Sequence, residues 1–557
     1  MNTRYPHPFH EDPEDGETES AGVPDPTTLA ELRMCKLSAQ LREKDRWWDK
    51  CWDENITRKW TAEVQEQQKD LVRWSKLSER MVNYVIEELQ AASRIREKTG
   101  GVEPGPFDRV YISDGLIAEE LTAQLAAAVK LLEDVPSNEK DWHPGSEERV
   151  LDLVHPSICP LVYDDSWGRS DEGVLQRFAM PALESDDVDA VFVSPRFQWL
   201  PSDFAVDDAG AVKLVSPYIN NIPSQHQDAF VPVLERIMER ALPLWEGVLT
   251  ELRTPPQPRI DHAAECVMGS GYTEDIPSDD ELTAELAKRE TELEPFRDWT
   301  YRYLLRGDLN LPEAPEQYVA RRGDVEAADR VSLRGSTIQV IVKLANIVLT
   351  PENPSYPGGI WHVEGMANES IVSTFIYYYD TDNIEPSSLS FRQATSQPEY
   401  HEQDDAACMT ILYGIDAQEP CVQVLGEVQT KAGRCIAFPN IYQHLVSPFS
   451  LVDTTKPGTR KILVFFLVDP TRRIVSATNV PPQQVWEMKR LLRAQGPQSR
   501  LSTLPLELVE YIATLVPGVK TRQEANEIRE ELMGERTIVV ESVDREYFSR
   551  SFNMCEH

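Results

Sequence analysis

The segment from residue 336 to residue 468 constrains the fold most, because it is a succession of short β-branched and aromatic runs. The first run, STIQVIVKLANIVLT, alternates in the manner of a strand. Further runs follow at 370–379, 388–393, 421–426, 433–438 and 460–468. Turns rich in Pro, Gly, Asn and Asp separate them, and no helical pattern intervenes. Such a succession is typical of an antiparallel sandwich or barrel.

Helical patterns flank this segment on both sides. Residues 28–135 carry strong helical periodicity at 78–95 and 115–133, and Thr27 or Thr28 is a suitable N-cap for the first helix. Residues 136–330 mix short apolar runs with one long helical run at 228–252. Residues 481–557 predict helices at about 482–495, 505–516 and 521–534. We therefore expect an α+β protein with a core at 331–480 and extensive helical elements before and after it.

The first 27 residues are rich in Pro, Asp, Glu and Gly. So little apolar surface cannot offset the entropy lost on ordering, so we expect a disordered acidic tail at 1–27.

Charge narrows the range of partners. The formal net charge is −37, with 93 acidic against 56 basic residues. A surface this acidic repels phosphate backbones and anionic lipid headgroups, which argues against nucleic acid and membrane surfaces as partners.

The chain carries no sign of export. No apolar run approaches the ~20 residues that span a bilayer, and the N-terminus lacks the features of a secretory or mitochondrial signal. The eight cysteines are scattered and form no CxxC pair, as expected of free thiols in a reducing compartment. We expect a cytoplasmic protein, and the sequence does not distinguish the cytoplasm from the nucleus.

A His-x-acid motif is the first hint of chemistry, although it is weak alone. Three copies occur, at His10/Asp12, His226/Asp228 and His362/Glu364. The first lies in the expected tail, and the second lies at a helix start, where Asp228 suits the helix dipole. The third lies between two strong strands, after the turn YPGG. One imidazole and one carboxylate two residues apart can reach the same ion at a strand end.

Two later residues make the third copy more specific. His444 follows the strand GRCIAF, 82 residues after His362, and Arg460 opens the strand KILVFFLV, 16 residues later. Two imidazoles and a carboxylate on one side of an ion form the facial site of non-haem iron enzymes. A guanidinium can bind the distal carboxylate of 2-oxoglutarate through two parallel hydrogen bonds. The sequence thus predicts His362, Glu364 and His444 as metal ligands and Arg460 as a cosubstrate anchor.

Other residues are weaker candidates. Asn346 and either Tyr377 or Tyr379 are predicted to line the cosubstrate pocket, although each is equally consistent with an ordinary strand residue. The cluster His401-Glu402 with Asp404 and Asp405 is a rival metal site, but an exposed loop explains it better. The terminal Cys555-Glu556-His557 could reach a metal, but a frayed end is the stronger expectation.

The motifs resemble those of the 2-oxoglutarate/Fe(II) oxygenase superfamily, and more narrowly of a mainly fungal family, the domain of unknown function 4246. WHVEGM and FPNIYQH with GTRKI carry the resemblance most specifically, and similar segments extend from about residue 30 to the end. The resemblance implies a double-stranded β-helix (jelly-roll) core with Fe(II) held by His362, Glu364 and His444. It also implies 2-oxoglutarate on Arg460.

The implied reaction consumes O2 and 2-oxoglutarate, oxidises a C–H bond of a small-molecule, amino-acid or peptide substrate, and releases succinate and CO2. The superfamily usually has Asp where this chain has Glu364. The extra methylene changes reach, although Glu can still ligate iron. A carboxylate of either kind argues against a halogenase.

Two other functional classes stay open. Two His and one carboxylate also suit zinc, as in a metal-dependent hydrolase or isomerase on a β-barrel. A non-catalytic interaction scaffold is the second, with the acidic tail and LSTLPLELVEYIATLV as its features, although that segment is more simply an amphipathic packing helix. Arg460 favours the oxygenase over the zinc enzyme, because such an enzyme needs no such anchor, and metal content would distinguish the scaffold. The sequence does not predict the substrate or the oligomeric state.

Overall fold

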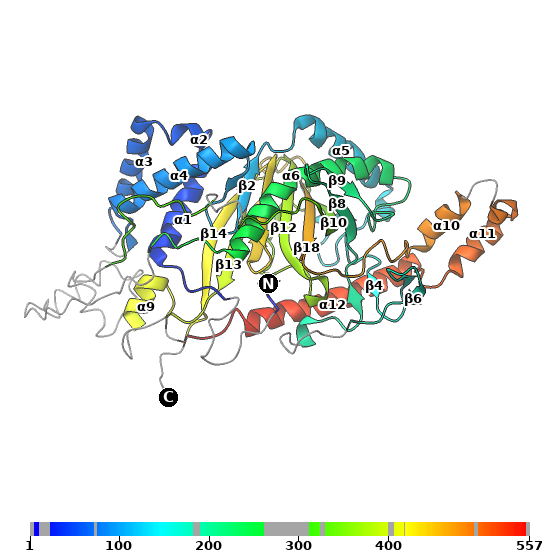
Figure 1. The fold of residues 1–557 in the computed structure, drawn as a ribbon. Helices are drawn as coiled ribbons and strands as arrows, with labels where there is room; N and C mark the ends of the chain where they lie inside the picture. Colours follow the sequence, from blue (N-terminus) through cyan, green and yellow to red (C-terminus); the bar gives the residue numbers. More distant parts are fainter. Residues whose placement is uncertain are drawn as a thin grey trace, which may run out of the picture.

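The computed structural model describes residues 5–9, 23–71, 75–181, 190–260, 311–322, 329–398, 406–416, 418–494 and 499–552. Over these residues the chain forms a mixed α+β fold in which antiparallel sheets are surrounded by helices (Figure 1). This confirms the predicted fold class at that level. None of the described helices combines the length and apolar character needed to cross a bilayer.

The largest sheet has nine strands, all paired antiparallel. Its centre consists of four strands from the predicted strand-rich segment, in the order β15 (Arg434–Pro439), β12 (Ile371–Asp382), β18 (Gly458–Val468) and β10 (Ser336–Leu349).

Strands from earlier in the chain extend both edges of this sheet. Beyond β15 lie β2 (Tyr111–Asp114) and β1 (Glu103–Pro104). β10 pairs with β8 (Ser202–Val206), which continues to β9 (Val212–Leu214), and also with β3 (Val150–Val154). The periodicity of residues 28–135 predicted a helical layer. This part also contains β1 and β2, which extend one edge of the large sheet.

A second sheet has the order β14 (Val422–Thr430), β13 (Ser387–Ala394) and β16 (Gln443–Val446). An isolated bridge between His362 and His444 continues it on the far side of β16. Next to it, β11 (Ser355–Tyr356) pairs with β17 (Phe449–Ser450). Two further hairpin-like pairs, β4 (Leu161–Val162) with β7 (Phe197–Gln198) and β5 (Trp167–Arg169) with β6 (Leu175–Arg177), lie outside these sheets.

Side-chain alternation gives the central strands two buried faces. One face packs against α5 (Glu119–Glu133) and α6 (Gln227–Arg253), with Trp245 against Phe375 and Phe465. The other face looks toward the second sheet, where Phe466, Phe438 and Phe391 belong to one cluster. We call this second face the inner face.

Four helices at the N-terminal end form their own apolar cluster beside the sheets: α1 (Leu29–Arg42), α2 (Trp47–Lys50), α3 (Glu54–Gln67) and α4 (Glu79–Thr99). Thr28 caps α1 by accepting from the backbone N–H of Glu31, as its sequence position predicted. The Trp-rich stretch supplies buried Trp47 and Trp60 to this cluster.

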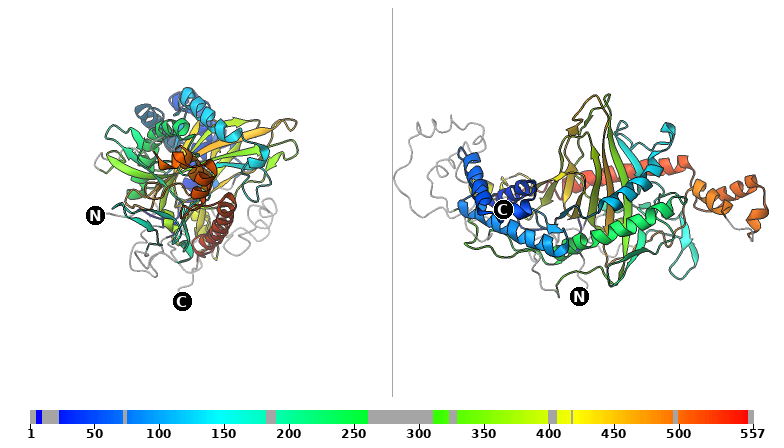
Figure 2. Two further views of the ribbon diagram at one scale, coloured as in Figure 1. Left: turned by 90° about the vertical axis from the view of Figure 1, so that its right-hand side faces the viewer. Right: turned by 90° about the horizontal axis from the view of Figure 1, so that it is seen from above.

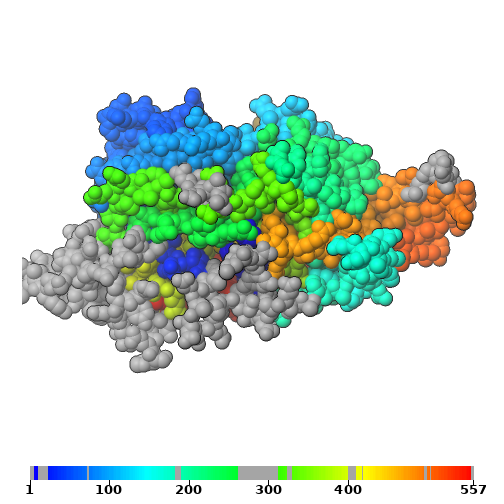
Figure 3. All heavy atoms as spheres, viewed as in Figure 1, coloured from blue at the N-terminus to red at the C-terminus, as the bar shows by residue number. Residues whose placement is uncertain are grey.

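Helices also dominate the C-terminal part. α10 (Val485–Arg493) and α11 (Leu506–Thr514) project from one end of the molecule (Figures 1, 2 and 3). α12 (Arg522–Glu546) begins with a Thr521/Glu524 capping box, runs twelve residues beyond its predicted end, and crosses one end of the sheets (Figure 1). The short helix α9 (Ala406–Tyr413) was not predicted.

Part of the expected disordered tail is packed on the body. Tyr5 and Phe9 are buried, with Arg253 over the Tyr5 ring and Phe9 against Phe192. These two aromatic side chains bury enough surface to hold residues 5–9, whereas composition averaged over 27 residues conceals them. Residues 1–4 and 10–22 lie outside the described residues.

Candidate metal centre

The three predicted ligands converge at one end of the second sheet. His362 and His444 pair through reciprocal backbone hydrogen bonds of 3.2 and 3.0 Å. Glu364 is fixed by Asn440, which accepts from its backbone N–H and donates to its carbonyl, both at 2.8 Å. Asn440 is 1% exposed and follows β15 directly, so the turn after that strand sets the position of Glu364.

The donor atoms of these side chains point at one another. Glu364 Oε1 lies 3.7 Å from His362 Nε2 and 3.5 Å from His444 Nε2, and one donor atom from each side chain lies within 4.8 Å of the others. His362 Nδ1–H donates to the carbonyl of Ile360 at 2.8 Å, which leaves the Nε2 lone pair free. An outer hydrogen bond of this kind commonly orients a metal-binding imidazole.

The charges of the three groups also suit a cation. Burial acts to raise the pKa of Glu364, but the two neighbouring imidazoles outweigh it and hold the pKa well below its usual range. Burial and the charge of His362 lower the pKa of His444. Burial acts to lower the pKa of His362, but Glu364 outweighs it and raises that pKa. The group therefore offers an ionised carboxylate and a neutral imidazole at His444, and a bound cation would displace a proton from His362, since metal ligands must be deprotonated. Its N,N,O donor set fits iron(II) or zinc.

The loop that carries the ligands is held from two sides. Val363 and Met366 pack with Val539, Val543 and Phe548 of the C-terminal part. Glu369, fully buried, accepts from the backbone N–H of Met366 and of Trp199, both at 2.7 Å. Arg536 of α12 pairs with the same carboxylate at 2.9 Å. α12 therefore helps to fix the loop between His362 and β12, and sequence inspection gave no sign of this.

Arg460 lies on the inner face and is 2% exposed. Its Nη1 donates to Ser387 Oγ at 2.9 Å and reaches Thr430 Oγ1 at 3.4 Å, while its Nε has no partner. The rings of Tyr378 and Phe449 flank the guanidinium. No described carboxylate pairs with it, and burial lowers its pKa. A buried guanidinium without a counterion is a suitable place for an anion.

The side chains of Asn346 and Tyr377 do not line the space around the Arg460 guanidinium, which corrects the prediction for both. Asn346 Nδ2 donates to Glu133 of α5 at 2.6 Å, and the Tyr377 hydroxyl bonds Thr122 of α5 at 2.6 Å. Both side chains therefore point away from the inner face. Tyr379 shares this side, since its hydroxyl donates to Asn346 Oδ1 at 3.3 Å.

The residues that do surround Arg460 were not singled out from the sequence. Tyr378, between the two tyrosines considered, faces inward because neighbouring side chains on a strand alternate. Ser387 and Thr430 lie opposite each other on β13 and β14 and share a 2.6 Å hydrogen bond. Only the pairing of those strands brings them to the guanidinium.

A second His-Asp-His group, at His143, Asp152 and His155, was also missed. His143 Nδ1–H donates to Asp152 Oδ2 at 2.8 Å, but Arg529 of α12 pairs with the same carboxylate. His155 Nδ1 accepts from the backbone N–H of Ser157, so a neutral His155 carries its proton on Nε2. A guanidinium on the carboxylate and a protonated Nε2 make this group a poor cation site.

The other sequence candidates play no part in the described site. His226 precedes α6 and Asp228 lies in its first turn, as expected of a dipole-stabilising acid. The pair His10/Asp12, the cluster at 401–405 and the end at 555–557 lie outside the described residues.

Fold and site together define a class: an α+β protein with antiparallel sheets that bring two histidines and a glutamate together as a candidate metal centre. The chain belongs to the family described as "Protein of unknown function (DUF4246)", whose model matches residues 79–489. The model "Domain of unknown function DUF4246, N-terminal" matches residues 1–63. This confirms the family predicted from the motifs. No curated protein matches the sequence.

Three solved structures resemble the chain at low sequence identity. The Fe(II)/(alpha)ketoglutarate-dependent dioxygenase TqaL matches at 12% identity and a TM-score of 0.28, over 72% of this chain and 96% of that one. The non-heme monooxygenase ThoJ in its nickel complex matches at 11% and 0.15, over 34% and 67%. IDO from Bacillus thuringiensis matches at 14% and 0.15, over 24% and 47%. TM-scores this low carry no argument about function.

Proposed function

We propose that this protein is a non-haem Fe(II) oxygenase that uses 2-oxoglutarate to oxidise a C–H bond of a small-molecule or peptide substrate, releasing succinate and CO2. The observation that carries the proposal is the acid-free, buried guanidinium of Arg460 on the inner face of the large sheet, which looks toward the second sheet where the His-Glu-His group converges. A zinc hydrolase or a binding scaffold would gain nothing from a charge buried in this way.

The strand order supports a double-stranded β-helix for the core. Four strands of the large sheet, β15-β12-β18-β10, face a second sheet β14-β13-β16 that continues through the His362–His444 bridge. Strands consecutive in sequence thus fall mostly in different sheets. We assign the core to residues 331–480 on this basis, with the parts before and after it as covering elements.

In this proposal His362, Glu364 and His444 hold Fe(II), and the ion supplies the redox chemistry with O2. The residues of the chain supply position and protection from water. The Ile360 carbonyl and Asn440 fix the orientation of the ligands. Phe438 presents its ring edge to His444 at 4.9 Å between centroids and keeps that side dry.

Arg460 would bind the far carboxylate of 2-oxoglutarate, with Ser387 and Thr430 holding the guanidinium in place. The spacing along β13 suits this role. His444 pairs with Phe391, and Ser387 lies four residues away on the same strand. Four residues correspond to roughly 13 Å of strand. A five-carbon dicarboxylate, the reach of an arginine and that of a metal-bound histidine together span such a distance.

Anaerobic titration tests the proposal. Purified protein should bind one Fe(II), and subsequent 2-oxoglutarate should produce the weak visible charge-transfer band of iron chelated by a 2-keto acid. Succinate, which lacks the keto oxygen, is the matched control and should give no band. Retention of zinc with no band under these conditions would contradict the oxygenase and favour the hydrolase class.

A further inference from the structure

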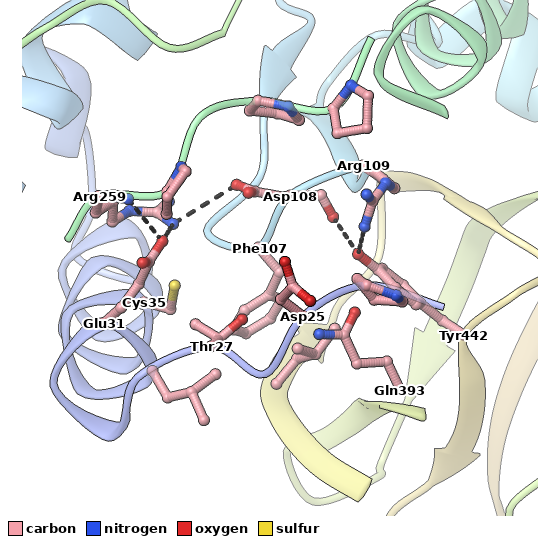
Figure 4. Close-up of a pocket in the computed structure, with 16 residues that line it drawn as sticks. Asp25, Thr27, Glu31, Cys35, Phe107, Asp108, Arg109, Arg259, Gln393 and Tyr442 are labelled. Carbon is pink, nitrogen blue, oxygen red and sulfur yellow. Dashed lines mark hydrogen bonds and ion pairs between the residues drawn. The ribbon is translucent and has the colours of Figure 1, made fainter. Parts of the chain in front are cut away.

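A cavity of about 290 Å³ lies between α1, the 107–109 turn, the 255–259 segment and β13 with β14 (Figure 4). This volume is close to the lower limit, ~300 Å³, of typical small-molecule sites. Apolar side chains form much of its wall: Leu32, Phe107, Leu425 and Pro24, Pro255, Pro256 and Pro258. Its polar lining includes Arg109, Arg259 and Gln393.

Arg109 is the arginine of this lining that forms no ion pair with a described residue. Burial acts to lower its pKa, but Tyr442, Asp108 and Glu251 outweigh burial and raise the pKa. Its guanidinium contacts the Tyr442 hydroxyl at 3.2 Å, its Nε has no partner, and it forms no ion pair with any residue that the structure describes. The nearby arginines differ. Arg259 pairs with Glu31 and Glu88, Arg321 with Asp108, and Arg322 with Glu251, at 3.2, 2.8, 2.9 and 2.8 Å.

The acids around the cavity are already engaged. Glu31 and Asp108 are held by those arginines, and Asp25 at the exposed rim accepts from Ser396 at 2.9 Å. An anion that enters would therefore meet one guanidinium that forms no ion pair, and carboxylates that already have partners. An anionic ligand would gain a charge-assisted hydrogen bond from the Arg109 guanidinium, whose Nε has no partner.

Gln393 provides a second, independent polar contact. Its side chain is 5% exposed, forms no hydrogen bond with any described residue, and its amide points into the cavity (Figure 4). An amide offers both a donor and an acceptor, and a buried one normally has partners. Arg109 and Gln393 thus both line the cavity near Tyr442 with unused hydrogen-bonding capacity (Figure 4).

The backbone of Arg109 is also unusual. Its φ is +61°, in the left-handed region that non-glycine residues rarely adopt. Glu251 Oε2 accepts from its N–H at 2.6 Å, and Glu251 is itself held by Tyr111 and Arg322. The protein therefore sustains a strained backbone that directs this side chain toward the cavity wall.

The cavity lies next to the candidate metal centre. Phe391 pairs with His444 and Arg392 with Gln443, so Gln393 and Tyr442 occupy the next position along the same two strands. This is two residues, or roughly 7 Å, from the metal ligand. Ring contacts link the two sites: Phe107 of the cavity wall lies 6.3 Å from Phe391, Phe391 lies 5.0 Å from Phe438, and Phe438 lies 4.9 Å from His444, between centroids.

We propose that this cavity binds the carboxylate of an organic acid with an apolar body, with Arg109 and Gln393 as the carboxylate-binding residues. This inference rests on the proposed function in one respect, since it takes the bound acid to be the substrate oxidised at the neighbouring metal. The carboxylate would contact Arg109 and Gln393, and the apolar body would pack on Phe107 and Leu425.

The first experiment measures binding alone, without metal. Calorimetry with 3-phenylpropanoate and with its uncharged amide should show the acid binding at least about tenfold more tightly, because only the acid forms a charge-assisted contact with a guanidinium. Arg109→Gln should reduce this ratio to about one, and Gln393→Leu should weaken the acid several-fold. Arg46→Gln, which removes another arginine with positive φ but outside the cavity, should change nothing.

Equal affinity for acid and amide in the wild type would overturn the proposal, as would an unchanged ratio in Arg109→Gln. If Arg109→Gln does not fold by circular dichroism, Gln393→Leu and Arg109→Lys decide in its place. Glu364→Gln should keep the binding of the acid, so failure of the metal centre and failure of this cavity are distinguishable.

The second experiment tests whether the acid is placed as a substrate. Adding 3-phenylpropanoate to the anaerobic Fe(II)–2-oxoglutarate complex should shift its visible band in the wild type and not in Arg109→Gln. Binding by calorimetry with no shift of the band would mean that the cavity is separate from the reaction site, and the substrate assignment would be wrong.

Discussion

Oε1 of Glu364 and Nε2 of His444 lie 3.5 Å apart, although 80 residues separate them in the chain. Two local devices produce this contact: the reciprocal hydrogen bonds between His362 and His444, and the clamp that Asn440 places on the backbone of Glu364. Each device belongs to the backbone or to a neutral amide, so the side chains of the three candidate ligands are free to meet a cation.

Removing the charge of Glu364 should abolish the metal site without unfolding the protein. We expect Glu364→Gln to weaken Fe(II) and Zn(II) binding by about 100-fold or more, since the carboxylate is the only anionic donor of the three. Metal content after dialysis and calorimetric titration would measure this. Glu352→Gln, at an exposed acid, is the control. Full metal retention in Glu364→Gln would exclude it as a ligand.

Arg460 should act on cosubstrate rather than on metal. Losing a charge-assisted contact costs about 1.5–3 kcal/mol, so Arg460→Ala should weaken 2-oxoglutarate about ten- to a hundredfold while Fe(II) affinity stays unchanged. Asn346→Ala and Tyr377→Phe serve as matched controls, because both side chains face α5. If these controls weaken 2-oxoglutarate as much as Arg460→Ala, the inner-face assignment is wrong.

Glu369 should couple stability to metal affinity. Its carboxylate serves two buried backbone N–H groups and Arg536, so Glu369→Gln leaves a buried guanidinium without its counterion. We expect a loss of about 3–5 kcal/mol in the free energy of unfolding, measured with urea, and metal binding about tenfold weaker. The double variant Glu369→Gln/Arg536→Met should recover part of the stability. A double variant less stable than the sum of its single changes would contradict this pairing.

Asp114 should make the free energy of unfolding depend on pH in the acidic range. Arg434 grips it with two hydrogen bonds of 2.7 and 2.9 Å, and the pKa of Asp114 falls from 3.8 to about 2 although burial opposes the change. A lowered carboxyl pKa contributes stability that is complete above about pH 4 and disappears as pH falls toward 2. Asp114→Asn should cost about 2 kcal/mol at pH 7 and progressively less below pH 4.

Urea unfolding from pH 7 down to the lowest pH at which the wild type folds would measure this difference. Asp45→Asn is the control, because the Asp45 side chain is 87% exposed. A cost for Asp114→Asn that stays constant with pH would show that Arg434 and Lys431 do not lower the pKa of Asp114 in the folded protein.

Local sequence determined most of the secondary structure. The runs at 336–350, 370–379 and 460–468 became the long central strands, because β-branched and aromatic side chains pack well on a pleated surface. Capping residues such as Thr28, Ser78 and Thr521 stand where helices begin. The order of His-x-Glu, His and Arg along these strands was readable as well, because each residue stands at a strand end or a turn.

The sequence did not show which side chains of the central strands point to the inner face. Residues 371–379 of β12 are all buried, so the alternation that distinguishes an inner from an outer face is absent from the sequence. Tyr377 and Tyr378 therefore look equivalent in the chain, although only Tyr378 contacts Arg460. The cavity was even harder to predict from the sequence, since Arg109 and Gln393 belong to no motif and are far apart in the chain.

The sequence by itself determined the strands, the helices and the identity of the chemical groups, because hydrophobic periodicity, capping and residue type are local properties. Only the tertiary structure decided which of these groups meet. Strand pairing brought His444 to Glu364, the burial of both sheet faces chose Tyr378 over Tyr377, and a left-handed backbone held by Glu251 aimed Arg109. Each of these depends on contacts between residues far apart in the chain, and a local pattern does not encode such contacts.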